Sequence, residues 1–68
     1  MDKEQMKEFL FKGVNLYTTG ILLQMQYEVK LESIPNQEDQ DTLKTIKKEN
    51  KKLLDTIKHF TRELERND

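Results

Sequence analysis

In the segment Leu43–Leu64, LKTIKKENKKLLDTIKHFTREL, one set of residues recurs at alternating steps of three and four positions, and all but one of them are apolar. This seven-residue repeat is typical of an α-helix that packs along another helix. Its stripe consists of Leu43, Ile46, Asn50, Leu53, Ile57, Phe60 and Leu64. Asn50 is the only polar member, so the segment predicts both a long helix and a buried amide.

Pro35 separates this helix from an earlier one. Proline disfavours helical backbone at the residue before it, so the first helix is predicted to end near Ser33. Asn36 can accept hydrogen bonds from the first N–H groups of the second helix. Glu38, Asp39 and Asp41 come next in the sequence, and their negative charges favour the positive end of the second helix dipole.

The chain is expected to form a single helical-hairpin domain over residues 1–68. Asp2 can cap the first helix, and Gln5 stands where a capping box requires it. The predicted elements are a helix over about 2–33, a loop over about 33–38 and a helix over about 37–65. The fold class is therefore all-α, a two-helix antiparallel hairpin.

The first helix is apolar around more than half of its circumference when residues are placed at intervals of about 100°. One stripe is expected to face the second helix, and it contains Phe9, Gly13, Leu16, Gly20, Leu23 and Tyr27. A second set is expected to form an oligomer or partner interface: Leu10, Phe11, Val14, Tyr17, Ile21, Leu22, Met25 and Val29. An arc this wide needs more neighbours than one helix can supply.

Self-association is the expected source of the missing neighbours. A chain of 68 residues without cysteine cannot use disulfides to support a small core. The simplest assembly is a homodimer that forms a four-helix bundle. With the chain reversing near Asn36, we expect Phe60 beside Gly13 and Leu53 beside Gly20 within each hairpin, where glycine would let the two helices approach closely.

Asn50 admits three interpretations. In a parallel coiled coil it would pair with its own copy and fix the register. In an antiparallel hairpin, Gln24 or Tyr27 could offer it a hydrogen bond. A seam open to water at this level is the third possibility. We favour the hairpin, with Asn50 buried and selecting one helix alignment.

The composition limits the classes of partner. The net charge is −1 although 37% of residues are charged, so attraction to nucleic acid or anionic lipid is not expected. The longest uncharged stretch, Gly13–Tyr27, is 15 residues, against the roughly 20 that a membrane span needs. The charged amino end does not resemble a signal peptide. We expect a cytoplasmic protein. The absence of alanine and the excess of lysine over arginine suggest an AT-rich bacterial or phage genome.

No pattern predicts catalysis, a cofactor or a metal site. Asp55, His59 and Glu63 share one side of the second helix and could in principle hold a divalent cation. Charged helix faces often show this spacing by chance, so exposed side chains are the favoured interpretation. We therefore expect a protein that is not an enzyme.

Two classes of function are compatible with these features. The first is a non-catalytic protein–protein interaction module, a small regulator, adaptor or subunit that acts through its apolar helical face. Its partner would be a second copy, another protein, or both in competition. The alternative is a nucleic-acid-binding helical dimer that uses the basic face over Lys44–Lys52.

Overall fold

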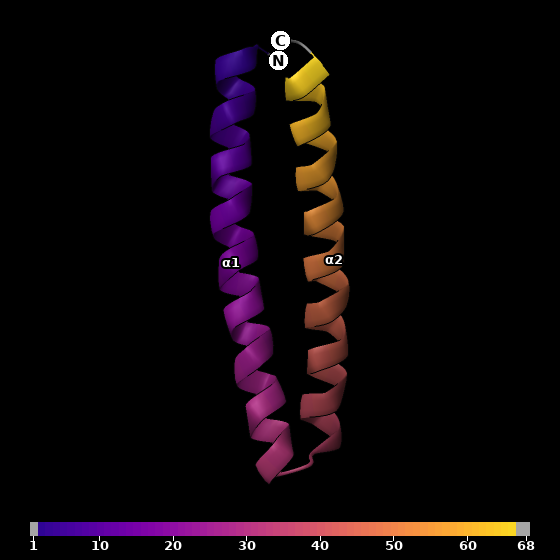
Figure 1. Cartoon of the computed structure of the whole chain (residues 1–68). Coiled ribbons are helices and arrows are strands. Elements are labelled where there is room, and N and C mark those ends of the chain that lie inside the picture. The colour runs from indigo at the N-terminus through magenta and orange to yellow at the C-terminus, as the bar shows by residue number, and fades with distance from the viewer. Residues whose placement is uncertain (1, 67–68) are drawn as a thin grey trace.

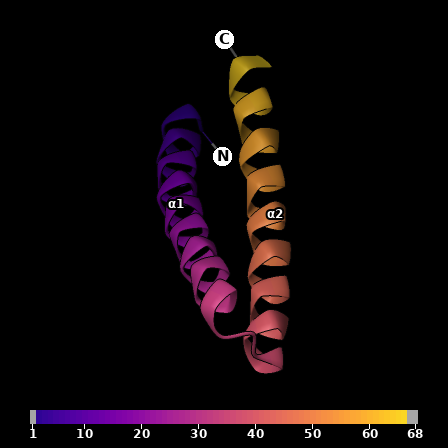
Figure 2. The ribbon, with the colours of Figure 1, turned by 60° about the horizontal axis from the view of Figure 1, so that its bottom comes forward.

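The computed structural model describes residues 2–66, which form two long helices joined by a short loop (Figure 1). Helix α1 spans Lys3–Ser33 and helix α2 spans Gln37–Arg66. They run antiparallel and side by side in both views, so the first turn of α1 and the last turn of α2 lie at the end opposite the loop (Figures 1 and 2). The predicted all-α hairpin is confirmed. Residues 1, 67 and 68 of the expected domain lie outside the described residues.

The start of α1 has the capping box that the sequence predicts. The backbone N–H of Gln5 donates to Asp2 Oδ1 over 2.8 Å, and the N–H of Asp2 donates to Gln5 Oε1 over 3.3 Å. These bonds satisfy two backbone donors near the helix terminus. A cap of this kind stabilises a helix by about 1 kcal/mol.

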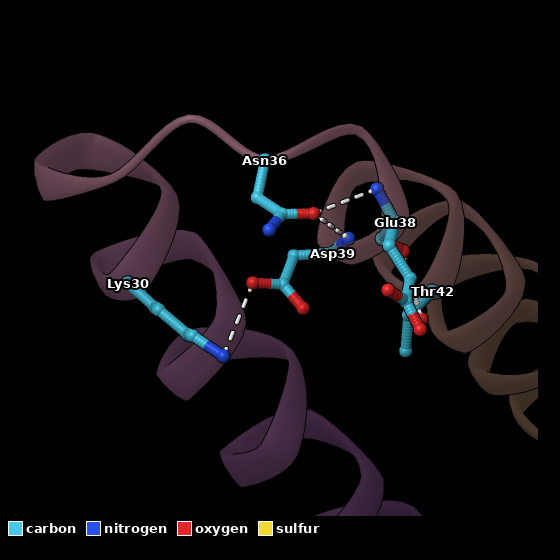
Figure 3. Close-up of polar contacts among 5 residues, drawn as sticks. All are labelled: Lys30, Asn36, Glu38, Asp39 and Thr42. Atoms are coloured by element: carbon cyan, nitrogen blue, oxygen red, sulfur yellow. Dashed lines mark hydrogen bonds and ion pairs between the residues drawn. The ribbon is translucent and has the colours of Figure 1, made fainter.

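The loop end is held by polar contacts between α1 and the first turn of α2 (Figure 3). Asn36 Oδ1 accepts from the N–H groups of Glu38 and Asp39 over 2.8 and 3.3 Å, which confirms Asn36 as the cap. Lys30 Nζ lies 3.1 Å from Asp39 Oδ2. The hydrogen bond to Asp39, together with its charge, raises the pKa of Lys30. Lys30 thus links the last turn of α1 to the start of α2.

The short connection Ile34–Asn36 sets the alignment of the two helices. Ile57 lies beside Gly13, and Asn50 lies beside Gly20. Both partners come about one helical turn earlier in α2 than the sequence predicted. The physical reason is that the chain reverses around Pro35, closer to α1 than expected, so each α1 residue meets an earlier α2 residue.

Candidate interaction surface

The face of α1 that packs on α2 follows its own seven-residue repeat. Its members are buried or half-buried, and they are Met6, Leu10, Gly13, Tyr17, Gly20, Gln24, Tyr27 and Leu31. The facing stripe of α2 is also buried or half-buried throughout, and it consists of Leu43, Ile46, Asn50, Leu53, Ile57, Phe60 and Leu64. The α2 stripe therefore lies where its periodicity places it.

Helix α1 is rotated relative to the expected packing. Three residues assigned from the sequence to the contact with α2 are instead exposed: Phe9, Leu16 and Leu23. Three residues assigned to the outer interface are half-buried: Leu10, Tyr17 and Ile21. The other five residues of that predicted interface are exposed, namely Phe11, Val14, Leu22, Met25 and Val29. The rotation leaves Gly13, Gly20 and Tyr27 facing α2.

The amide of Asn50 explains this rotation. Asn50 is 8% exposed, as predicted for a buried polar residue. Its Nδ2 donates to the carbonyl oxygen of Gly20 over 3.0 Å and to Gln24 Oε1 over 3.1 Å. Leaving such a group unpaired costs about 1–3 kcal/mol. A rotation that presented Leu23 instead of Gln24 would remove one of these partners.

Gly20 and Gly13 make different contacts with α2. A Cβ atom at Gly20 would collide with Asn50 Oδ1 and lie 3.1 Å from Asn50 Cγ. A Cβ atom at Gly13 would lie 3.4 Å from Ile57 Cγ1, an ordinary van der Waals distance. The position beside Asn50 therefore requires glycine, whereas the position beside Ile57 has room for a Cβ atom.

Sequence reasoning missed Met6 as a member of the contact and left Gln24 out of the predicted stripe. Met6 is the one hydrophobic residue classed as buried among residues 2–66, at 7% exposure. The signal was its spacing, because Met6, Gly13, Gly20 and Tyr27 are each seven residues apart. The need of Asn50 for a polar neighbour did indicate Gln24, as one of two possible partners, and the structure shows the bond.

All exposed large apolar side chains of α1 except Val29, which lies four residues beyond Met25, fall in two stripes on opposite sides of the helix. We call the first the Leu16 stripe, which consists of Phe9, Leu16 and Leu23. We call the second the Thr18 stripe, which consists of Phe11, Val14, Thr18, Leu22 and Met25. Helical spacing separates their centres by about 160°. Neither α1 nor α2 combines the length and the hydropathy that crossing a membrane would require.

The Leu16 stripe borders a shallow groove of about 200 Å³ between the two helices. Phe9 and Phe60 close one end, with ring centroids 4.9 Å apart. Leu16 and Leu53 line the apolar wall. This stripe is thus partly sheltered by α2. The Thr18 stripe extends further around α1, and Phe11 there is 71% exposed.

The outer face of α2 is polar. Lys44, Lys47, Lys48 and Lys51 are exposed and have no ion-pair partner within residues 2–66, whereas Lys52 lies 3.6 Å from Glu49. Asp55, His59 and Glu63 do not come together as possible metal ligands, and no other described residues form such a group. His59 instead makes an edge contact with the ring of Phe60.

Comparison with protein-family models, with curated proteins and with solved structures finds no match to this chain.

Proposed function

We propose that this protein is a non-catalytic protein–protein interaction module that acts through the exposed apolar side of α1. One observation carries the proposal. Every exposed large apolar side chain among residues 2–66 belongs to α1 or to Ile34 just after it, and none belongs to α2. Apolar surface concentrated on one element in this way is typical of an interface.

The simplest partner is a second copy of the chain, which would complete a four-helix bundle. Val14, Leu22 and Met25 are each about half exposed in the hairpin, and Phe11 is more exposed. Full burial of such side chains stabilises by roughly 1.5–3 kcal/mol each, so covering these four is worth about 3–7 kcal/mol per copy as an upper bound. The stabilisation summed over both copies falls within the range of the free-energy cost of association. A heterologous partner would compete for the same surface.

Sedimentation equilibrium of the wild type and two charge variants tests the proposal. The wild type is expected at twice the chain mass of 8.2 kDa. Leu22→Glu places a charge in the Thr18 stripe and should shift the protein to monomer. Lys48→Glu is the matched control, because it changes an exposed residue on the outer face of α2 and should leave the mass unchanged.

The outcome also separates self-association from other partners. A helical wild-type monomer at high concentration would contradict the homodimer. In that case, a captured protein that binds wild type but not Leu22→Glu would support a heterologous module. If Lys48→Glu also failed to bind the captured protein, the binding surface would not be confined to α1.

The exposed lysines of α2 support nucleic-acid binding as a second candidate. Lys44, Lys47, Lys48 and Lys51 lack acidic partners within the described part of the chain, and a dimer would present two such faces. Binding to DNA or RNA that weakens steeply as salt is added, and that Lys48→Glu reduces, would favour this function. Binding that is absent at low salt would exclude it.

A further inference from the structure

The Thr18 stripe has a spacing that reads the same in both directions along α1. Its steps from Phe11 to Met25 are three, four, four and three residues, with Thr18 at the centre. Two identical stripes of this kind match when one copy is reversed about Thr18. In an antiparallel two-fold interface residue i contacts residue j and residue j contacts residue i, so this spacing keeps the stripe in contact with its copy along its whole length.

We propose that a second copy packs antiparallel along the Thr18 stripe, with the two-fold axis at Thr18. This inference rests on the proposed self-association and specifies its surface, orientation and register. Phe11 then faces Met25 of the second copy, and Val14 faces Leu22 of the second copy. Each contact occurs twice, so a large side chain meets a large one at both ends and a medium one meets a medium one nearer the centre.

Thr18 suits the central position for two reasons. Its side chain is small, which permits close approach of the two helices. Its Oγ1 donates to the carbonyl oxygen of Val14 over 2.9 Å. The hydroxyl proton is already bonded within α1, so burial at the axis leaves no unpaired donor.

The position of Lys7, beyond the Phe11 end of the stripe, favours the same orientation. In this register Lys7 lies level with Val29 of the second copy. Glu28 and Glu32 of the second copy lie one and three residues along the helix from that level, and Glu32 is level with Glu4, so Lys7 meets three carboxylates and offsets part of their mutual repulsion. Lys7 lies 3.5 Å from Glu4 in the same helix and is half-exposed, so it can reach a further carboxylate. A parallel arrangement would place Lys7 beside its own copy, where the like charges repel.

Single introduced cysteines can distinguish this register from others, because the chain has no cysteine of its own and a disulfide can form only where two introduced cysteines meet. Packed helix axes lie about 8–10 Å apart and Cα atoms lie about 2.3 Å from each axis. The Cα atoms of facing Thr18 residues therefore come within about 3.4–5.4 Å, and the upper part of this range is a separation that a disulfide spans. The two Phe11 residues are separated by about 21 Å in the antiparallel register, since each residue rises 1.5 Å.

Disulfide formation under mild oxidation tests the proposal, with covalent dimer measured by mass spectrometry. Thr18→Cys should link to itself at least roughly tenfold faster than Lys48→Cys, which reports random collisions on the outer face of α2. Phe11→Cys alone and Met25→Cys alone should stay at the collision rate. An equimolar mixture of these two should link. Circular dichroism of each reduced variant checks that the helices remain.

Each other pattern overturns the proposal in an identifiable way. Self-linking of Phe11→Cys would show a parallel interface. Self-linking of Leu16→Cys faster than Thr18→Cys would show that the Leu16 stripe forms the contact. A wild-type dimer by sedimentation with no variant above the collision rate would overturn the register alone. A wild-type monomer would overturn both the register and the proposed self-association.

Discussion

Gly13 and Gly20 lie seven residues apart on the same face of α1, and the two levels of the hairpin are built differently. Beside Gly13 the contact is apolar, with Ile57 at van der Waals distance from a hypothetical Cβ atom. Beside Gly20 the space is filled by the amide of Asn50, which is bonded to Gly20 and Gln24. The same residue type is thus tolerated at one level and required at the other.

This difference shows that close helix approach has a specific cause in this protein. Glycine inside a helix costs about 1 kcal/mol relative to alanine. At Gly20 the cost is offset by an amide that reaches the α1 backbone. At Gly13 no polar contact depends on the missing side chain. The four predictions below test this contrast by removing the polar contact, the space for it, or the glycine that does not need it.

Asn50→Asp should have the largest effect. The substitution keeps the shape but replaces the donor with an acceptor that faces the carbonyl oxygen of Gly20 and Gln24 Oε1. We expect a loss of about 2–4 kcal/mol in the free energy of unfolding at pH 7, measured by urea denaturation. Asn15→Asp, at an exposed position of α1, is the control and should change stability by less than about 0.5 kcal/mol.

The same variant gives a pH dependence of defined sign. Burial and the facing oxygens raise the folded-state pKa of the introduced carboxyl above its unfolded value. The destabilisation is therefore fully present above the folded-state pKa. It diminishes as the pH falls and the carboxyl gains a proton that it can donate. A loss that is independent of pH would show that the carboxylate escapes to solvent.

Gly20→Ala should destabilise by about 1–3 kcal/mol, since its methyl group would displace the Asn50 amide from its two acceptors. Adding Asn50→Ala in a double-mutant cycle should remove most of this cost, because the obstructing amide is gone. Thermal unfolding followed by circular dichroism measures both effects. Equal costs with and without Asn50 would mean that the α1 backbone approach itself excludes the methyl group.

Asn50→Leu should leave the protein folded, with stability unchanged or higher by about 1–2 kcal/mol. Leucine has nearly the same shape, and Gln24 can still bond to Glu28, to which its Nε2 already donates over 3.1 Å. The main effect should be on specificity, because an apolar stripe permits other registers. Sedimentation and native mass spectrometry should reveal a changed or mixed assembly. A single assembly of unchanged mass would show that Asn50 does not select the helix alignment.

Gly13→Ala should have the smallest effect, a gain of up to about 1 kcal/mol from helix propensity. The new methyl group would meet Ile57 at an ordinary distance. The free energy of unfolding from urea denaturation, compared with that of Gly20→Ala, measures the contrast between the two levels. Equal destabilisation at both positions would mean that both glycines serve close helix approach.

The sequence alone determined helix α2 and the residues at which both helices begin. Alternating steps of three and four residues from Leu43 to Leu64 define a single narrow stripe, so only one face of α2 can be buried. Caps at Asp2 and Asn36 are local, since their hydrogen bonds span two or three residues. Burial of Asn50 follows from its place in that stripe. These features depend on neighbours in the chain and are readable without the fold.

The tertiary structure decided the rotation of α1 and the register between the helices. Apolar residues surround most of α1, so its periodicity fits several rotations about equally well. The choice between them falls to contacts with distant residues: Gln24 and the carbonyl of Gly20 satisfy Asn50. The position of the chain reversal around Pro35 then fixes which turns meet. The pattern of a helix with one apolar face determines which side packs against its neighbour. For a helix that is apolar on nearly every side, its few polar and smallest residues determine that side.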